Sequence, residues 1–469
     1  MVDIKNIQTI YFIGIGGIGM SALARYFSFH GKEVSGYDKT ETALTRQLVS
    51  EGIDIHYEDN IELAPKSADI IVYTPAIKEH AELKYYQENN FTILKRSDVL
   101  GIITNGSFNI CVAGTHGKTT ISSMIAHILR HSGYGCNAFL GGIAVNYNSN
   151  YWSHERNTCV VEADEYDRSF LKLHPDIAVI SSMDPDHLDI YGTEEVMQEA
   201  FIEFSGKVKK EGTLLSKFGV EGKQSFKAPQ QLTYSLQNSS ADAFATNIRM
   251  SRGSYEFDVM HKDWMLDNVK LNMGGMHNVE NIVVAITIAH LLEIENEKIK
   301  DAVEAYKGVK RRFEYIIKKD GPESNNDFVY IDDYAHHPEE LKALITGATS
   351  LFSGMHCTII FQPHLFSRTK DFADAFAQTL DLADEVILLP IYPARELHMP
   401  GVTSSLVFDK MKNNNKRILA KHEVVEYIKG RFANDGGYGI GNILITAGAG
   451  DVDALVQPLK EMLTKKGEG

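Results

Sequence analysis

The segment 113–120, Ala-Gly-Thr-His-Gly-Lys-Thr-Thr, places the strongest constraint on how this chain can fold. It follows an apolar run at 109–112 and opens a helical pattern at 121–129. Glycines between a strand and a helix let the backbone turn tightly and direct its N–H groups at phosphate oxygens. Lys118 would add a positive charge for the β- and γ-phosphates, and Thr119 a hydroxyl for Mg²⁺. The segment therefore predicts a strand, a phosphate-binding loop and a helix in succession.

The rest of the chain extends this unit to an α/β protein of about three domains, because 469 residues are too many for one hydrophobic core. Apolar runs alternate with helical patterns, which predicts mostly parallel sheets. We place the domains at residues 1–107, 108–311 and 312–469. Strands are predicted at 9–13, 33–37, 69–73, 92–94, 110–113, 158–161, 177–181, 329–331, 357–361, 385–389 and 442–446, and an antiparallel insertion or edge at 212–271.

Charge and composition exclude several classes of protein. Lys and Arg total 47 against 62 Asp and Glu, and the net charge of −15 argues against broad nucleic-acid binding. The four cysteines are widely separated, which is typical of reduced thiols in the cytoplasm. No secretory signal and no apolar run of about eighteen residues is present. We therefore expect a cytoplasmic protein without membrane contact, either a monomer or a weak homodimer.

A second glycine-rich loop lies near the start of the chain. Gly14, Gly16 and Gly19 fit the pattern G-x-G-x-x-G after a predicted strand, and Asp38 ends the next strand. Such a loop allows a diphosphate to approach a helix N-terminus, with the acid placed on a ribose hydroxyl. The diphosphate can belong to NAD, FAD or a UDP-sugar, and a tight turn without a ligand gives the same pattern. The motif alone does not choose among these.

Two acidic clusters follow strands of the predicted central domain. The first, at 162–167, contains Glu162, and acids this close raise each other's pKa unless a cation lies among them. Mg²⁺ needs only one or two carboxylates when ATP phosphates supply other oxygen ligands. The second cluster, at 184–189, surrounds His187 with aspartates, which favours a functional histidine over a structural one. A solvated acidic loop is the alternative for the first cluster.

The third domain repeats this arrangement. Asp333, Tyr334 and His336 follow the predicted strand at 329–331, at the carboxyl end where open α/β sheets bind ligands. The adjacent histidines lack further ligands at zinc spacing. Arg368, after the next strand, supplies a guanidinium suited to a carboxylate, although an exposed arginine at a helix start would look the same.

These motifs stand in one order along the chain, and the sequence resembles the Mur ligase family over nearly its full length. Mur ligases form amide bonds with ATP, and a compact phosphate loop is typical of them; here Val112 stands where the usual loop has its first glycine. The other segments that carry the resemblance are Glu-Ala-Asp-Glu (162–165), Asp-His-Leu-Asp (186–189), Met-His-Asn-Val-Glu-Asn (276–281), Arg-Arg-Phe-Glu (311–314) and Asp-Asp-Tyr-Ala-His-His-Pro (332–338).

Within the family, the chain is most similar to the branch that joins L-alanine to UDP-N-acetylmuramate. The opening segment 14–24, Phe-Gln-Pro-His (361–364) and Ile-Tyr-Pro-Ala-Arg-Glu (391–396) point to this branch. The resemblance implies a Rossmann-like N-terminal domain for the UDP-sugar, a central P-loop ATPase and a Rossmann-like C-terminal domain for the amino acid. It also implies ATP and Mg²⁺ as cofactors and assigns the first glycine loop to UDP rather than to NAD.

The resemblance further implies roles for individual residues. Those expected to bind ATP are Gly114, Thr115, His116, Gly117, Lys118, Thr119, Thr120, Asn278 and Asn281 beside adenine, and Arg312 and Asp333 when the domains close. The metal would be held by Thr119, Glu162 and His187, the UDP-sugar by Gly14, Gly16, Gly17, Gly19 and Asp38, and the amino acid by Tyr334, His336 and Arg368. The residues expected to act in catalysis are Lys118, Glu162, His187, His336, as a candidate proton acceptor, and Arg368.

Three departures from the family pattern bear on the substrate. Leu365 stands where many relatives have an arginine for the carboxylate of the amino acid, so Arg368 would carry more of that role. Tyr166 occupies a position that is often serine in the alanine-adding branch and often tyrosine in the muropeptide-recycling branch. No lysine lies where several Mur ligases carry a carbamylated one, the nearest being Lys207, so we predict none.

Three other functions stay open at this point. A recycling ligase would add L-Ala-γ-D-Glu-meso-diaminopimelate to the same sugar nucleotide. An NAD-dependent oxidoreductase is favoured only by the first glycine loop and Asp38. A nucleotide switch without catalysis would bind ATP but show no turnover stimulated by substrate.

Overall fold

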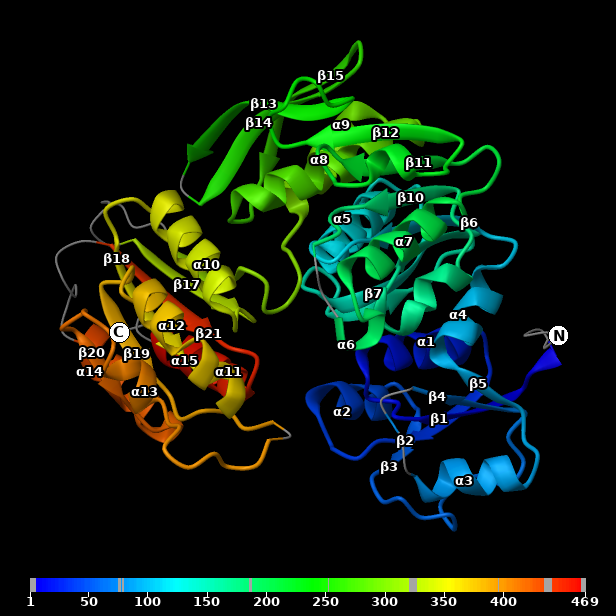
Figure 1. The fold of residues 1–469 in the computed structure, drawn as a ribbon, viewed down its shortest axis with the longest axis horizontal. Coiled ribbons are helices and arrows are strands. Elements are labelled where there is room, and N and C mark those ends of the chain that lie inside the picture. Colours follow the sequence, from blue (N-terminus) through cyan, green and yellow to red (C-terminus); the bar gives the residue numbers. More distant parts are fainter. Residues whose placement is uncertain are drawn as a thin grey trace. The chain divides into compact units, whose positions relative to one another are not determined.

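The computed structural model describes residues 6–74, 77, 80–184, 188–251, 253–319, 327–394, 396–433 and 441–464. The chain divides into two compact units. The first holds Met1–Thr246, Asp258–Asp267 and Glu280–Val303, and the second holds Asn247–Phe257, Asn268–Val279 and Glu304–Gly469. Three sheets with helices on their faces form the framework (Figure 1).

The first sheet is parallel, with strand order β3-β2-β1-β4-β5. Helices α1 and α3 cover opposite faces of this sheet (Figure 1). In α1, Met20, Leu23 and Phe27 recur at helical spacing and are buried in the same core as Phe12 of β1. The elements are β1 (Thr9–Ile13), α1 (Ile18–Phe29), β2 (Glu33–Tyr37), α2 (Ala43–Ser50), β3 (Asp54–His56), β4 (Ile70–Tyr73), α3 (Ala81–Glu88), β5 (Ile93–Lys95) and α4 (Arg96–Thr104).

The second sheet has the strand order β15-β14-β13-β12-β11-β10-β6-β9-β7-β8. Its central strand β6 pairs in parallel with β10 and β9, and β6 leads through the predicted phosphate loop into α5. The elements up to β10 are β6 (Phe108–Ala113), α5 (Lys118–His131), β7 (Asn137–Ala144), β8 (Ser149–Trp152), β9 (Thr158–Glu162), the 3₁₀ helix η2 (Tyr166–Lys172) and β10 (Ile177–Ile180).

Beyond β10 the parallel part of the sheet includes more strands than the sequence predicts. The stretch expected to be antiparallel begins with strands that extend the parallel sheet, because β11 pairs in parallel with β10, β12 with β11, and β13 with β12. Helix α7 links β10 to β11 and permits that parallel crossover. The elements are α6 (Leu188–Tyr191), α7 (Glu194–Ser205), β11 (Thr213–Lys217), η3 (Lys223–Ser225), β12 (Gln230–Ser235), β13 (Ala243–Ser251), β14 (Ser254–His261), β15 (Trp264–Leu271), α8 (Met276–Leu291) and α9 (Asn296–Ala305).

The third sheet has the order β16-β17-β21-β18-β19-β20, with β16 antiparallel to β17 and the other pairs parallel. The elements are β16 (Glu314–Lys319), β17 (Phe328–Asp333), α10 (Pro338–Leu351), β18 (His356–Phe361), α11 (Phe366–Asp371), α12 (Ala373–Leu380), β19 (Glu385–Leu388), α13 (Ser405–Phe408), β20 (Lys416–Ile418), α14 (Lys421–Ala433), β21 (Asn442–Ala447), η5 (Asp451–Leu455) and α15 (Val456–Thr464). Within the described part of the chain, no helix combines the length and hydrophobicity needed to cross a membrane.

Candidate active site

The predicted phosphate loop lies between β6 and α5 and is fixed by the chain that follows β10. Gly114 has φ +128°, and a Cβ there would collide with Ser181 and with the backbone of Ser182, so only glycine fits. Thr115 N donates to Ser182 O at 3.2 Å, and His116 N donates to Ser182 Oγ at 2.8 Å. Gly117, at φ +82°, is the N-cap of α5. The loop is therefore ordered by its own sheet, with the N-terminus of α5 directly behind it.

Lys118, the first residue of α5, is held at the loop by two acceptors. Its Nζ donates to Gly114 O at 2.7 Å and to Glu165 Oε1 at 2.7 Å. The Glu165 side chain is 1% exposed, and its burial raises the carboxyl pKa while the Lys118 charge opposes that rise. The second Glu165 oxygen, Oε2, is buried without a hydrogen-bond partner among the described residues. An ammonium has three protons, so Lys118 keeps one for a ligand.

Thr119 and Glu162 come together as the sequence predicts for a metal site. The Thr119 hydroxyl donates to Glu162 Oε1 at 3.0 Å, and Gly141 N of β7 donates to Glu162 Oε2 at 2.9 Å. Burial raises the pKa of the Glu162 carboxyl, and the nearby Lys118 charge opposes that rise. A half-buried carboxylate next to a hydroxyl offers the oxygen donors that Mg²⁺ prefers.

The third predicted metal ligand, His187, lies outside the described residues. Asp184, in the same acidic cluster, is described and lies 3.8 Å from His116 of the phosphate loop, between Oδ2 and Nε2. Both side chains are largely exposed, at 69% and 72%. The pair places Asp184, the first residue of that cluster, beside the loop with its side chain exposed.

The first glycine loop is tied down by the end of β2. Gly14 N donates to Tyr37 O at 2.8 Å, and Gly16 N donates to Asp38 Oδ2 at 2.8 Å. The Asp38 carboxylate thus already accepts one N–H of the loop. Gly17 is the N-cap of α1, and Gly19 lies in its first turn beside Arg96, whose Nη1 would be 2.8 Å from a Cβ at position 19.

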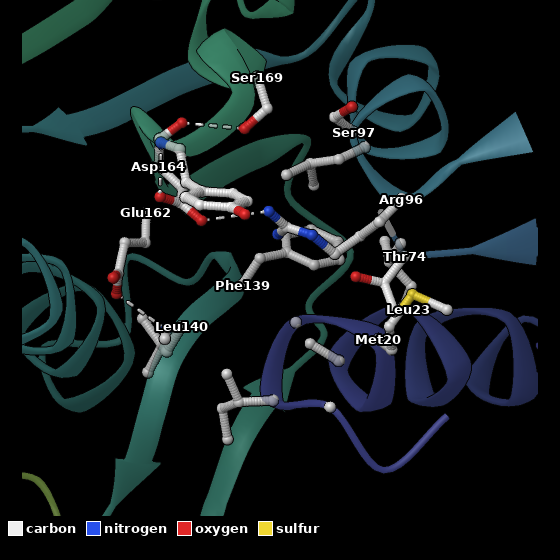
Figure 2. Close-up of a pocket in the computed structure, with 17 residues that line it drawn as sticks. Met20, Leu23, Thr74, Arg96, Ser97, Phe139, Leu140, Glu162, Asp164 and Ser169 are labelled. Carbon is white, nitrogen blue, oxygen red and sulfur yellow. Dashed lines mark hydrogen bonds and ion pairs between the residues drawn. The ribbon is translucent and has the colours of Figure 1, made fainter. Parts of the chain in front are cut away.

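A cavity of about 430 Å³ joins this loop to Glu162. Figure 2 shows Met20 and Leu23 of α1 on one side of it and Glu162 and Leu140 on another. Arg96, the first residue of α4, extends across the cavity toward Asp164, and its Nη2 lies 3.4 Å from Asp164 Oδ2 (Figure 2). The cavity therefore extends from the first glycine loop to Glu162 of the predicted metal site and is lined by the Arg96 guanidinium and the Asp164 carboxylate.

The two asparagines of the predicted adenine site lie near the start of α8, three positions apart. Asn278 is 2% exposed, and its Nδ2 donates to Gly274 O at 2.6 Å. Asn281 is 9% exposed and lies against the phosphate loop, because its Oδ1 would be 3.2 Å from a Cβ on Gly117. Asn278 belongs to the second unit and Asn281 to the first. Within the first unit, Asn281 therefore joins the candidate nucleotide site.

In the second unit, Asp333 at the end of β17 organises the chain around it. Its Oδ2 accepts from Phe313 N at 2.6 Å and its Oδ1 from Ala335 N at 2.7 Å. Burial raises its pKa to about 6, although these two N–H groups oppose the rise. Arg312 is exposed, whereas Arg311 is bound internally, with Nε 3.5 Å from Asp332 Oδ2. Arg312 is thus the more exposed of the two arginines, and its charge acts on the Asp333 carboxylate.

A cluster of histidines and aromatic rings follows β17 and β18 in the same unit. His336 Nδ1 lies 2.9 Å from Tyr334 O, and its ring is 6.0 Å from that of His364. Arg368 Nη1 lies 3.5 Å from His364 Nδ1. Burial lowers the pKa of both His336 and His364, and the Arg368 charge adds to this effect. The structure therefore brings His336 and Arg368 together through His364.

Three residues of these sites, Arg96, Glu165 and His364, are not predicted from the sequence. Glu165 and His364 lie inside motifs that the sequence analysis recognises, but nothing in the motifs distinguishes them from their neighbours. Arg96 begins α4, far in sequence from either glycine loop, and no local pattern marks it. Only the packing of α4 against α1 reveals its position.

Models of three Mur ligase domains match this chain in succession. The model described as "Mur ligase family, catalytic domain" matches residues 9–107, "Mur ligase middle domain" matches 112–289, and "Mur ligase, glutamate ligase domain" matches 311–450. The chain belongs to the Mur ligase family. The prediction of the family from the ordered motifs is therefore confirmed.

Two full-length relatives of this Mur ligase carry the same name. A UDP-N-acetylmuramate–L-alanine ligase of Flavobacterium johnsoniae is 46% identical, covering 99% of this chain and 100% of its own, and one of Parabacteroides distasonis is 46% identical, covering 99% of each. The crystal structure of a UDP-N-acetylmuramate–alanine ligase of Thermotoga maritima matches with a TM-score of 0.82 at 26% identity, covering 98% and 99% of the two chains. A murein peptide ligase of Psychrobacter arcticus shares the fold, with a TM-score of 0.64 at 21% identity, covering 98% and 99%. The predicted three-domain α/β architecture is confirmed.

Proposed function

We propose that this Mur ligase is an ATP-dependent enzyme that joins L-alanine to the lactyl carboxylate of UDP-N-acetylmuramate. The observation that carries the proposal is its 46% identity, over 99% of its length, to a protein named for that reaction. The geometry agrees with it, because one unit holds two loops for anionic groups and the cavity between them. The enzyme would act in the cytoplasm, where its nucleotide substrates occur.

The phosphate loop is proposed to bind ATP. The N–H groups of 114–120 and the N-terminus of α5 would face the phosphates. The third N–H of the Lys118 ammonium would donate a hydrogen bond to a phosphate oxygen. Thr119 and Glu162 fit a magnesium ion, and His187 is proposed as a further ligand. When bound, Mg²⁺ would neutralise the charge that develops on the transferring phosphate. Asn278, Asn281, Arg312 and Asp333 are proposed to contact the rest of the nucleotide.

The first glycine loop and the cavity are proposed to hold UDP-N-acetylmuramate. Its diphosphate would lie at the N-terminus of α1, near Gly14, Gly16, Gly17 and Gly19, with Arg96 supplying positive charge. Asp38 would fix the loop from behind. Because the cavity continues to Glu162, the sugar would extend toward the metal site and carry its lactyl carboxylate there. The reacting carboxylate and the γ-phosphate would thereby be positioned for transfer.

The chemistry then follows from the need to activate a carboxylate. A lactyl carboxylate oxygen attacks the γ-phosphorus of ATP, the bond to the bridging oxygen of ADP breaks, and an acyl phosphate forms. The uncharged amine of L-alanine attacks the acyl carbon, and the tetrahedral intermediate expels inorganic phosphate. Lys118 would stabilise the first step by its charge.

The amino acid is proposed to bind in the second unit beside Tyr334, His336 and Arg368. The Arg368 guanidinium would hold the carboxylate of L-alanine, since Leu365 provides no cation. Burial lowers the pKa of His336, so its imidazole is neutral near pH 7 and can accept the proton that the amine must lose. Such a base is more useful here than a charged histidine.

A second candidate reaction uses a peptide in place of L-alanine. Tyr166, which lines the cavity, is the residue that the sequence analysis associates with ligases that add L-Ala-γ-D-Glu-meso-diaminopimelate. The two reactions share the sugar nucleotide and ATP and differ only in the amine. The amine donor therefore decides between them.

The deciding experiment measures ADP release with Mg²⁺, ATP and UDP-N-acetylmuramate in the presence of one amine donor at a time. L-Alanine, glycine, L-serine and the tripeptide are compared. We expect L-alanine to stimulate release most strongly. Stimulation by the tripeptide alone would support the recycling reaction, and no stimulation by any donor would contradict both.

A further inference from the structure

A second group of potential metal ligands lies on the α3 face of the first sheet, away from the proposed active site. Asp59 follows β3, His80 immediately precedes α3, and Glu82 lies in its first turn. One ligand atom from each of these side chains lies within 4.8 Å of those of the other two. Among the described residues, no other trio of His, Cys, Asp or Glu side chains meets this condition. The proposed reaction uses none of the three.

His80 is the most unusual member of the group. Its side chain is only 5% exposed, and neither ring nitrogen makes a hydrogen bond to any described residue. Nδ1 lies 3.3 Å from Asp59 Oδ1, close enough for an ion pair. The ring packs on Tyr37, with centroids 4.4 Å apart. A buried imidazole whose two nitrogens make no hydrogen bond is costly unless a ligand binds them.

Capping of the α3 N-terminus does not explain why the His80 side chain is buried there. As the N-cap of this helix, His80 makes no side-chain capping bond. The orphan N–H groups are instead capped by Asp59, which accepts from Ala81 N at 2.9 Å and from Glu82 N at 3.2 Å. Asp59 is thereby fixed facing the imidazole, and among the described residues neither nitrogen of His80 makes a hydrogen bond.

Glu82 is held in place by groups around it. It is completely buried, its Oε2 accepts from the Tyr11 hydroxyl, and its Oε1 accepts from Asn60 N at 3.2 Å. His56 Nε2 lies 3.7 Å from Glu82 Oε1. Such outer contacts orient the carboxylates of metal sites. The acid therefore has the fixed position of a ligand rather than the mobility of a surface side chain.

We propose that Asp59, His80 and Glu82 bind a divalent first-row transition ion such as Zn²⁺. Nitrogen and carboxylate ligands lie about 2.1 Å from such an ion, which places neighbouring ligand atoms about 3.4 Å apart in a tetrahedral site. The 3.3 Å between His80 Nδ1 and Asp59 Oδ1 matches this spacing. One imidazole and two carboxylates suit Zn²⁺ better than Mg²⁺, which prefers oxygen alone. Asp59 is exposed, so water can complete the coordination.

The ion would fasten the start of α3 to the segment after β3. Thr74 and Ile77, between β4 and α3, lie against Gly14 of the first glycine loop, where a Cβ would be 3.1 Å and 2.9 Å from their side chains. The metal site would thus support that loop from behind.

The competing explanation is that His80 is protonated and pairs with the two acids. His80→Phe separates the two explanations, because phenylalanine keeps the ring on Tyr37 and removes both nitrogens. If the site is a metal site, the metal-free variant should melt at or above the temperature of the metal-free wild type. If His80 is an imidazolium, the variant should melt lower, because two acids lose their partner.

The experiment uses the full chain after treatment with a chelator. Zn²⁺ binding is measured by equilibrium dialysis, and the melting temperature is recorded with Zn²⁺, with Mg²⁺ and without metal. Wild type, His80→Phe and Asp59→Asn are compared with His174→Phe, which removes an exposed histidine elsewhere. Exposed histidines bind Zn²⁺ weakly, so His174→Phe measures that background.

We expect one tight Zn²⁺ per chain, a rise in melting temperature with Zn²⁺ but not Mg²⁺, and at least an about tenfold loss of affinity in His80→Phe and Asp59→Asn. His174→Phe should behave as the wild type does. Equal Zn²⁺ binding by wild type and His80→Phe would overturn the proposal, as would a metal-free His80→Phe that melts below the wild type while Zn²⁺ leaves the wild type unchanged.

Discussion

The two glycine loops of the first unit share a backbone plan but differ in where their positive charge comes from. In both, a buried parallel strand leads through glycines into a helix, α1 or α5. The phosphate loop carries its own cation, Lys118, at the first position of α5. The first loop has no charged residue, and its cation is Arg96 of α4, next to Gly19.

This difference explains why one loop can be interpreted from sequence and the other cannot. A cation inside the motif marks the phosphate loop as a site for a highly charged anion. A cation supplied by another helix leaves no trace in the first loop, so a dinucleotide and a nucleotide sugar stay equally consistent with it. The anchoring differs too, since Asp38 holds the first loop and Ser182 the second.

The largest effect should come from removing Lys118, the cation within the phosphate loop. Lys118→Met should lower kcat by about 10³-fold, because no other side chain of the loop carries a full positive charge toward the phosphates. ADP release measures the loss. Lys270→Met, which removes a surface lysine paired with Glu304, serves as the control and should keep its activity. A loss of less than about tenfold in Lys118→Met would show that the loop does not depend on its own cation.

A substitution outside both loops should change the binding of neither ATP nor the UDP-sugar. His336→Gln should lower kcat by about 10²-fold while leaving the KM values for ATP and the UDP-sugar unchanged. Burial holds the His336 pKa below its usual 6.5, so the wild-type rate should fall only as the pH drops below that value, where the imidazole gains a proton.

The pH dependence of kcat is the measurement for this prediction. The acid limb of the profile should disappear in His336→Gln, because glutamine does not titrate. Glu340, which faces His336, opposes the shift, whereas Arg368 and His337 add to it. An unchanged acid limb in the variant would assign the titration to another group.

Removing Arg96, the cation that α4 supplies, should affect binding at the first glycine loop only. Arg96→Met should raise the KM for UDP-N-acetylmuramate about tenfold, the effect of losing a hydrogen bond to a charged group. The KM for ATP should stay the same. Arg46→Met, at an exposed ion pair with Glu41, is the matched control. Equal increases in both KM values would remove the distinction between the loops.

The smallest effect should distinguish two carboxylates at opposite ends of β1. Asp38 accepts from Gly16 N in the loop, whereas Asp69 accepts from Gln8 N at 2.7 Å and Thr9 N at 2.9 Å at the start of the strand. Asp38→Asn should raise the KM for the UDP-sugar about threefold, as expected for one weakened hydrogen bond. Asp69→Asn should lower the melting temperature without changing that KM.

The melting temperature of Asp69→Asn also has a predictable dependence on pH. The two N–H groups lower the pKa of Asp69 below its usual value, so its contribution to stability is present above the unfolded pKa and is lost as the pH falls through the folded one. The difference in melting temperature between wild type and Asp69→Asn should therefore disappear at acidic pH. If Asp69→Asn changed the KM for the UDP-sugar without changing the melting temperature, the roles assigned to the two carboxylates would be contradicted.

How much of the fold the sequence predicts depends on how clearly the residue pattern of each strand stands out from its flanks. Strand β1 has the predicted bounds because its apolar run lies between Gln8 and Gly14, and β2 has them although its sequence, Glu-Val-Ser-Gly-Tyr, alternates polar and apolar residues. The short edge strand β20, Lys416–Ile418, has no apolar run and was missed. Strand β7, Asn137–Ala144, contains two glycines and was missed for a similar reason.

The sites follow the same principle. Thr119 and Glu162 could be paired from sequence, because each ends or follows a strand at the same edge of one sheet. Arg96 and Glu165 could not be recognised, because their roles depend on helix packing and on one rotamer. For Tyr334, His336 and Arg368, the sequence indicates a common edge, and the structure adds His364 between two of them.

The most direct test of the proposed reaction follows the oxygen atoms of the lactyl carboxylate. UDP-N-acetylmuramate labelled with ¹⁸O in that carboxylate is incubated with the enzyme, Mg²⁺, ATP and L-alanine, and the inorganic phosphate is analysed by mass spectrometry. An acyl phosphate leaves one carboxylate oxygen on the phosphate, so ¹⁸O should appear there at one atom per turnover. Turnover that yields unlabelled phosphate would contradict the mechanism.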